Sequence, residues 1–263
     1  MNRKDKKEYS IQAVDNAMRL FDEFRDGEEL GVTALARRLD LHKNNVFRVL
    51  ATLEQRGYIE QNPATGGYRL GVAALQLGHA YTRGGDLLAR ARAVVRELAA
   101  RCGETIHLGI LRGHEVVHLD GAPSGRLLAG ALRVGERLPA HCTALGKALL
   151  GCAPAGLREA YDRDVASRGL EERTPASIVD PQKLFEQMRS SAVRGFALDL
   201  EECERGLVCA AAPVFDSEGA AVAALSLSAP GFRVDEARLI EEAVPQVVEA
   251  AGRISRDLGY ATA

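Results

Sequence analysis

Three polar side chains that can read DNA bases recur at intervals of four residues near the start of the chain. If the stretch around them is helical, Asn44, Arg48 and Thr52 share one face of that helix. In the major groove, asparagine pairs with adenine and arginine pairs with guanine. The pattern therefore predicts a helix that contacts DNA. Together with neighbouring residues that are placed for phosphates, the predicted contacts are Arg37, Lys43, Asn44, Asn45, Arg48 and Thr52.

The local charge around these residues favours a polyanionic partner, although the whole chain is nearly neutral. The chain carries 34 Lys and Arg against 36 Asp and Glu, a net charge of -2. Between Ala34 and Gly57, five basic residues stand against two acidic ones, so this segment alone has a net charge of +3. Contact with DNA phosphates requires such a local excess.

Helices and short strands must position this polar face. A tight turn separates two expected helices, residues 33–39 and 43–56, and the second has an apolar stripe. That stripe consists of Val46, Val49, Leu50 and Leu53. Two short strands, Ile59–Gln61 and Gly67–Leu70, follow on either side of a turn rich in Gly and Pro. This order is typical of a winged helix-turn-helix, and a winged helix used only for protein contacts is the alternative.

Residues that commonly cap helices mark the expected helix starts in this region. Ser10 is placed to cap an expected helix that runs from Ile11 through Phe24. Thr33 is placed to cap the next helix, and His42 to cap the DNA-contacting helix. Gly57 provides the C-terminal stop of that last helix.

A second polar set lies in the C-terminal part of the chain. Ser226 and Ser228 alternate with leucines in an expected strand, so both hydroxyls point to one face of a sheet. The amides that begin a helix at residues 144–146 can bind an anion. The set as a whole comprises His141–Lys147, Asp199, Leu207, Cys209 and Ser226–Ser228, and it suggests a small polar pocket. Local satisfaction of each polar group by the backbone is the alternative.

The elements around this second set predict an α+β domain, an antiparallel sheet flanked by helices. Its expected strands are residues 105–111, 115–119, 126–131, 196–199, 207–215 and 221–228. The expected helices are residues 72–83, 86–101 and 141–150, two that begin at Pro154 and Pro181, and 235–258 with a kink at Pro245. We divide the chain into a flexible basic arm (1–8), a winged helix-turn-helix domain (9–71), a linker helix (72–86) and a C-terminal domain (87–263).

Composition and spacing exclude several classes. The five cysteines are odd in number and irregularly spaced, and the N-terminus lacks the apolar core of a signal peptide, so we expect a cytoplasmic protein without disulfides. No apolar run is long enough for a membrane span. Gly146-Lys147 lacks the rest of a P-loop, and no nucleophile elbow surrounds Ser226. We expect no catalytic residues, cofactor or bound metal.

The chain resembles the IclR family of bacterial transcriptional regulators from about Tyr9 to Tyr260. The segments that carry the resemblance are Leu35–Leu41, Arg48–Glu54, Gly57–Ile59, Tyr68–Gly71, Leu138–His141, Thr143–Leu150, Arg194–Ala197, Ala211–Asp216 and Ala224–Ser228. The resemblance implies a winged helix-turn-helix joined by a helix to a GAF-like effector domain, and a homodimer or tetramer. It also implies which residues contact the effector: Ala144 and Leu145 through their amides, with Asp199, Leu207, Cys209, Ser226 and Ser228. With no Trp and 5% aromatic residues, a bulky aromatic effector is disfavoured.

We therefore expect a ligand-responsive transcriptional repressor that binds a pseudo-palindromic operator in double-stranded DNA and senses a small organic acid or catabolite, with a carboxylate favoured. Two other classes remain open. One is a metal- or redox-sensing regulator that uses His141, Cys142, Cys203 and Cys209. The other is an enzyme that acts on a small acid.

Overall fold

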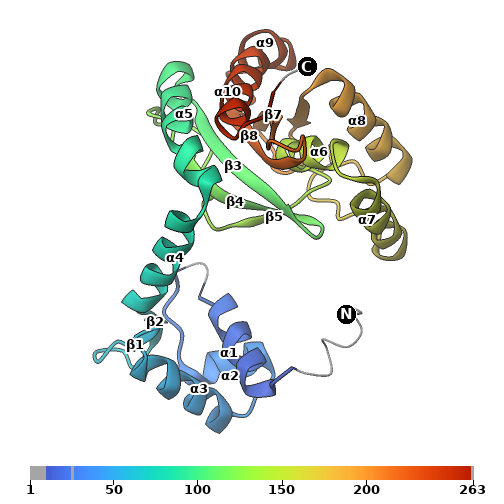
Figure 1. Ribbon diagram of the computed structural model, residues 1–263. Coiled ribbons are helices and arrows are strands. Elements are labelled where there is room, and N and C mark those ends of the chain that lie inside the picture. The colour runs from blue at the N-terminus through green and yellow to red at the C-terminus, as the bar shows by residue number, and fades with distance from the viewer. Residues whose placement is uncertain (1–9, 25–26, 262–263) are drawn as a thin grey trace. The chain divides into compact units, whose positions relative to one another are not determined.

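The chain forms two compact units, residues 1–84 and 85–263. The computed structural model describes residues 10–24 and 27–261, apart from the side chains of 82–84 (Figure 1). The predicted basic arm, residues 1–8, lies outside the described residues.

The N-terminal unit is a winged helix-turn-helix. Its elements are α1 (Gln12–Asp22), α2 (Val32–Leu39), α3 (Lys43–Gln55), β1 (Ile59–Gln61), β2 (Tyr68–Leu70) and α4 (Val72–Gly84). The antiparallel pair β1–β2 forms the wing, and Leu30 extends it through an isolated bridge to Tyr68. The core contains Leu20, Phe24, Leu35, Leu39, Val46 and Leu50. The three helices thus pack around one small aliphatic centre that fixes the orientation of α3.

Two of the predicted helix caps in this unit are wrong. The carbonyl of Ile11 accepts the N–H groups of Val14 and Asp15, so Ile11 is the N-cap of α1 and Ser10 lies one residue outside. Gly31 takes the N-cap position of α2, and Thr33 is inside the helix. His42 does occupy the N-cap of α3, although its side chain makes no capping hydrogen bond. Packing of the apolar stripes, rather than cap chemistry, sets these starts.

The C-terminal unit is built on a six-stranded antiparallel sheet with the order β5-β4-β3-β8-β7-β6. Its strands are β3 (Thr105–Arg112), β4 (Glu115–Ala122), β5 (Arg137–Pro139), β6 (Ala197–Leu200), β7 (Leu207–Phe215) and β8 (Ala221–Pro230). Its helices are α5 (Asp86–Cys102), α6 (Ala144–Gly151), α7 (Ala155–Arg168), α8 (Pro181–Arg194), α9 (Glu236–Arg238) and α10 (Val244–Asp257). Asp86 therefore opens α5 and does not belong to the linker helix, which ends at Gly84.

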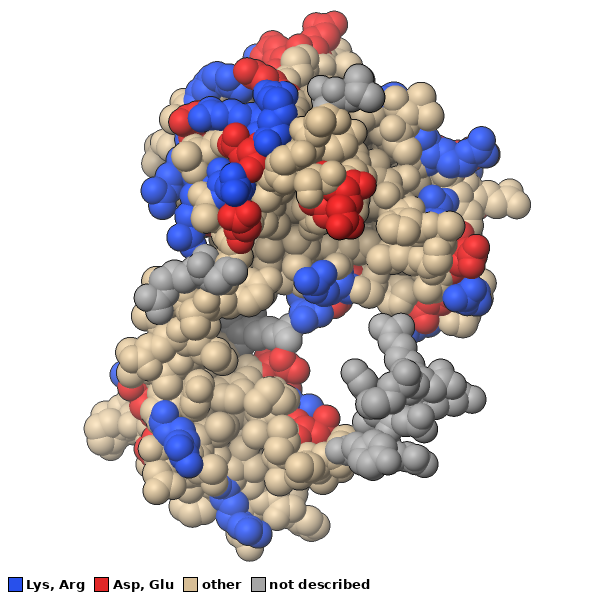
Figure 2. Space-filling model, viewed as in Figure 1, with Lys and Arg blue, Asp and Glu red and all other residues tan. Residues whose placement is uncertain are grey.

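Each face of this sheet carries its own helical layer (Figure 1). Alternate residues of β3, β7 and β8, such as Leu108, Ala210 and Leu225, face α5 and α10. The intervening residues of β7 and β8, such as Ala211 and Ala224, face α6, with α7 and α8 in the same cluster. Ion pairs such as Arg101–Glu249 and Arg253–Glu97 join α5 to α10. Figure 2 shows blue and red side chains interleaved over this part of the C-terminal unit.

The strand predicted at residues 126–131 is wrong. Strands β4 and β8 occupy both edges of β3, and none of the described strands pairs with this segment. It leaves the sheet and is held by side chains: Thr105 Oγ1 donates to the carbonyl of Gly130 over 2.7 Å. The irregularity predicted at Pro245 takes the form of a π-helical turn, Leu239–Ala243, just before α10.

Candidate functional site

The outward face of α3 carries the polar residues that the sequence predicted. Val46 and Leu50 are fully buried, and Val49 and Leu53 are half-buried, so the apolar stripe points into the N-terminal unit. All of the polar residues Arg37, Lys43, Asn44, Asn45, Arg48 and Thr52 are exposed. Phe47, which the polar pattern missed, is 55% exposed on the same helix. Phe47 directly follows the buried Val46, and this position in the helix was the signal in the sequence that its side chain points outward.

Three of these cations are available to phosphates. In the described part of the chain, the side chains of Arg37, Lys43 and Arg48 have no ion-pair partner, whereas Arg38 pairs with Glu28 over 3.1 Å. In the view of Figure 2, blue atoms lie at the end of the N-terminal unit where α3 runs in Figure 1. The unit therefore offers unpaired positive charge beside an exposed helix face.

A groove of about 530 Å³ runs between α1 and α3. Asn45, Arg48 and Thr52 line its α3 side, and Thr52 Oγ1 donates to the carbonyl of Arg48 over 2.8 Å. The hydroxyl of Thr52 is thereby engaged as a donor and can only accept from a base. Asn44 points away from the core more directly, because it lies on the opposite side of the helix from the buried stripe.

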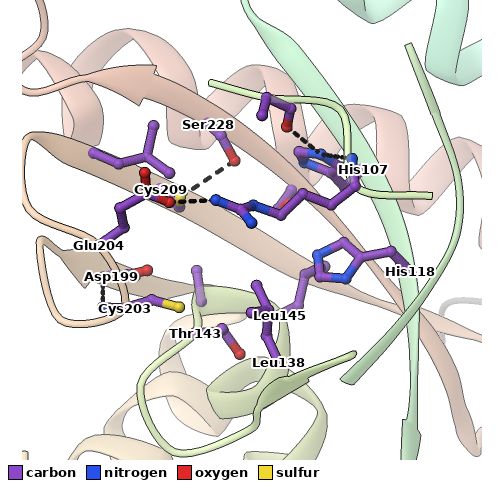
Figure 3. A pocket seen from close by; sticks show the side chains of 15 residues that line it. His107, His118, Leu138, Thr143, Leu145, Asp199, Cys203, Glu204, Cys209 and Ser228 are labelled. Atoms are coloured by element: carbon purple, nitrogen blue, oxygen red, sulfur yellow. Dashed lines mark hydrogen bonds and ion pairs between the residues drawn. The ribbon is translucent and has the colours of Figure 1, made fainter. Parts of the chain in front are cut away.

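In the C-terminal unit, one small cavity gathers all seven of the predicted ligand-contacting residues (Figure 3). Ala144 and Leu145 come from the start of α6, Asp199 from β6, and the remainder from β7 and β8: Leu207, Cys209, Ser226 and Ser228. Ser228 is paired in register with both Thr105 and Cys209, and the thiol of Cys209 donates to Ser228 Oγ over 3.2 Å. The cavity measures about 30 Å³.

The N-terminus of α6 is held against this cavity by tight packing. Thr143 caps the helix, since its hydroxyl accepts the N–H of Gly146 over 3.1 Å. The N–H groups of Ala144 and Leu145 precede any intrahelical acceptor and remain available to a ligand. A Cβ on Gly146 would lie 2.1 Å from the carbonyl oxygen of Ala140, so only glycine lets the helix begin this close to the preceding chain. The predicted start at His141 is three residues too early.

Comparison with known proteins agrees with both units. Residues 13–63 match the IclR helix-turn-helix domain, and residues 79–256 match the domain described as bacterial transcriptional regulator IclR C-terminal. The chain belongs to the IclR family of transcriptional regulators. It is 38% identical to the HTH-type transcriptional regulator XynR of Escherichia coli K12 over 95% of this chain and 98% of that protein.

Two further relatives of this IclR-family regulator bear on function. The HTH-type transcriptional repressor AllR of Klebsiella pneumoniae is 32% identical over 89% of this chain and 85% of that protein. The structure of an IclR homolog from Microbacterium hydrocarbonoxydans in complex with 4-hydroxybenzoate matches with a TM-score of 0.80 and 26% identity, covering 94% of this chain and 98% of that one. The protein is therefore a DNA-binding transcriptional regulator and not an enzyme. None of its described helices combines the length and apolarity that a membrane crossing needs.

Asp199 is the acidic group of the cavity in this IclR-family regulator. It is 2% exposed, and its Oδ1 accepts the N–H groups of Glu202 over 2.8 Å and Cys203 over 3.4 Å. Burial, with the nearby charge of Glu202, raises the pKa of Asp199 to about 8. At neutral pH the carboxyl is therefore mainly protonated, and Oδ2 can donate a hydrogen bond to an anion.

A buried ion pair stands behind Asp199. Lys147 Nζ lies 2.5 Å from Glu202 Oε1 and 2.9 Å from Gln187 Oε1, with the lysine side chain 1% exposed. Among the described residues, Glu202 Oε2 is a buried oxygen without a hydrogen-bond partner. Glu202 lies in the loop that follows β6. Its side chain is held by Lys147, and its backbone N–H donates to the carboxyl of Asp199, so both bonds fix this loop.

The sequence missed two histidines that also line the cavity. His107 and His118 stack edge to face at 5.1 Å, and His107 is in register with Ser226. Burial, then the charge of His118, lowers the pKa of His107 to about 3, and burial also lowers the pKa of His118. Both rings are neutral at pH 7. His107 alternates with apolar residues on β3, a pattern visible in the sequence. Its pairing with Ser226 of β8, which places it at the cavity, is visible only in the structure.

Among the described residues, the four that the metal- or redox-sensing alternative would use do not form one ligand set, although Cys142 and Cys203 interact with each other. His141 Nε2 contacts the carbonyl of Glu171 over 2.8 Å, outside the residues that line the cavity, while Cys209 bonds to Ser228. The Cys142 thiol donates to the carbonyl of Pro139 over 3.7 Å. Its interaction with Cys203 lowers the pKa of Cys203 to about 7 and raises the pKa of Cys142. Within the described chain, no three His, Cys, Asp or Glu side chains are grouped to hold a metal ion.

Proposed function

We propose that this regulator binds a pseudo-palindromic operator as a homodimer or tetramer in the cytoplasm, represses transcription, and releases DNA when a small carboxylate enters the cavity of its C-terminal unit. The name of AllR supports repression. A symmetric dimer presents two copies of α3 to successive half-sites. The ligand acts by binding the DNA-competent and incompetent arrangements unequally.

The observation that carries this proposal is the convergence of donors in one cavity. Five residues with a group that can donate line the same cavity: Ala144 and Leu145 through their amides, Ser226 and Ser228 through their hydroxyls, and the protonated Asp199. Converging donors suit an oxyanion, and Leu145 and Leu207 offer apolar contact for a short carbon skeleton. That the homolog from Microbacterium hydrocarbonoxydans was crystallised with 4-hydroxybenzoate, a carboxylic acid, supports the same chemical class.

Replacing both Ser226 and Ser228 by alanine is expected to abolish the response to the acid and to leave operator affinity unchanged. Both hydroxyls belong to residues only 3–5% exposed on the sheet face beneath the cavity, remote in sequence from α3. Electrophoretic mobility shifts on the upstream promoter fragment, with and without a panel of small carboxylates, measure both properties. Retention of the full response in the double variant would place the ligand elsewhere.

Replacing Arg48 by alanine is expected to weaken operator binding by about 1–3 kcal/mol, because an arginine that reads a base contributes on this order. Random DNA of the same length should lose much less. The exposed Arg56, at the C-cap of α3, is the matched control, since Arg56→Ala removes an equal charge away from the helix start. Equal losses on both DNAs would reassign Arg48 to phosphate contact.

A further inference from the structure

The cavity is too small for the acid that the proposed function requires. At about 30 Å³ it accommodates only about two water molecules. Some part of its lining must therefore give way before a carboxylate with a carbon skeleton enters. The sheet and α6 are poor candidates, because Ala144 and Leu145, like Ser226 and Ser228, are at least 95% buried.

The segment between β4 and β5 is the part of the lining that can move. Side-chain contacts hold its middle to the sheet: Thr105 Oγ1 donates to the Gly130 carbonyl over 2.7 Å, and His107 Nε2 lies 3.2 Å from the Ala131 carbonyl. Backbone hydrogen bonds of Gly135 and Glu136 with His118 hold its end. Its backbone nevertheless lies directly on the cavity, since a Cβ on Gly130 would approach Ser228 Cβ to 3.3 Å. Displacing residues 130–133 breaks side-chain contacts with Thr105, His107 and Glu204 but no ladder of strand pairing.

Arg133 is carried on this segment and is the single Lys or Arg among the residues that line the cavity. Its guanidinium is held between two carboxylates: Nη1 pairs with Glu136 at 3.0 Å, and Nη2 pairs with Glu204. The dashed line at Glu204 in Figure 3 marks the second pair. Glu204 also lines the cavity, whereas Glu136 does not. The arginine side chain is 22% exposed, so this charge is partly withdrawn from water.

We infer that Arg133 is the cation that selects an acid, and that Glu204 holds the place of the ligand carboxylate until the acid arrives. The inference rests on the proposed function and names a specificity-determining pair within it. An entering carboxylate replaces Glu204 at the guanidinium of Arg133. A guanidinium binds a carboxylate by donating two parallel N–H groups to its oxygens. Glu204 is then a built-in competitor for the guanidinium of Arg133.

The test is calorimetric titration of the full chain with acetate, lactate, succinate, gluconate and benzoate, each beside its neutral amide. Glu204→Gln removes the competitor and is expected to tighten binding of the acids that bind wild type by about tenfold. Arg133→Gln is expected to weaken the same acids by at least about tenfold and to leave the amides unchanged. Glu136→Gln is the matched control, because it removes a carboxylate that pairs with Arg133 outside the cavity, and its effect should be much smaller.

The outcomes separate this inference from the proposed function. Suppose that Arg133→Gln binds the acids as tightly as wild type while the Ser226, Ser228 double variant loses them. The ligand then binds in the proposed cavity, and Arg133 has no part in its selection. If Glu204→Gln binds the acids no tighter than wild type, or no tighter than Glu136→Gln does, Glu204 is not a competitor. Binding of the amides as tightly as the acids would overturn selection for charge. If wild type binds none of the five acids, the proposed function and this inference both fall.

Discussion

Replacing Lys147 by methionine is expected to lower the free energy of unfolding of the C-terminal unit by about 3–5 kcal/mol, because it leaves the Glu202 carboxylate buried and uncompensated. Lys147 is 1% exposed and Glu202 is 7% exposed by side chain, so water cannot replace the lost partner. Burial already raises the pKa of Glu202, and Lys147 opposes that rise. The variant should therefore recover stability as the pH falls toward the ordinary glutamate pKa of 4.5, where Glu202 takes up a proton.

Urea unfolding followed by far-ultraviolet circular dichroism measures this loss, and hydrogen exchange of peptides from α6 and α8 assigns it to the C-terminal unit. Lys183→Met is the matched control, because Lys183 is exposed on α8, and it should change stability by less than about 0.5 kcal/mol. The double variant Lys147→Met with Glu202→Gln should recover much of the loss, since neither charge remains. A Lys147→Met protein as stable as the Lys183→Met control would show that the pair is not a structural requirement.

Affinity for an acid effector is expected to fall by about thirtyfold between pH 7 and pH 9.5, because Asp199, with a pKa of about 8, must be protonated to donate to an anion. A carboxyl whose pKa is raised is neutral below that value, so the donor is present at neutral pH and is lost as the pH rises through 8. Above that value the ionised Asp199 also repels the ligand. Titration of wild type with the tightest-binding acid at several pH values measures the fall.

The variant Asp199→Asn should bind the acid with little dependence on pH in this range. Its amide keeps an oxygen for the N–H groups of Glu202 and Cys203 and keeps a donor toward the cavity. Cys203, with a pKa of about 7, also titrates here, and Arg173, Arg133 and Glu204 act on it. Cys203→Ser removes that titration and should retain most of the fall. If the fall instead disappears in Cys203→Ser and persists in Asp199→Asn, the thiol is responsible and the prediction is wrong.

Local periodicity is sufficient for the helices and strands that carry most of the site. The apolar stripe of α3 runs through Val46 and Leu50, and the alternation of β8 places Ser226 and Ser228 on one face. Both patterns repeat with the period of the backbone itself, so they are visible without knowledge of any partner. The sequence also predicts strand β7 with its observed limits, Leu207–Phe215, from a continuous apolar run between turn signals.

The predictions fail where the outcome depends on a distant segment. The strand expected at residues 126–131 lacks a partner because β8, almost a hundred residues later, takes the free edge of β3. Thr33 has the chemistry of a helix cap, but packing of Leu35 and Leu39 starts α2 earlier. These are cases in which tertiary contacts outweigh local preference.

The sequence by itself determined the order of the elements, the outward polar face of α3 and the shared sheet face of the two serines, since each follows from spacing along one element. Only the tertiary structure decided that His107, Arg133 and Glu204 line the same cavity as the two serines, that Lys147 neutralises Glu202, and that burial raises the pKa of Asp199. The register between strands and the exclusion of water create these properties. Both depend on groups that lie far apart in the chain.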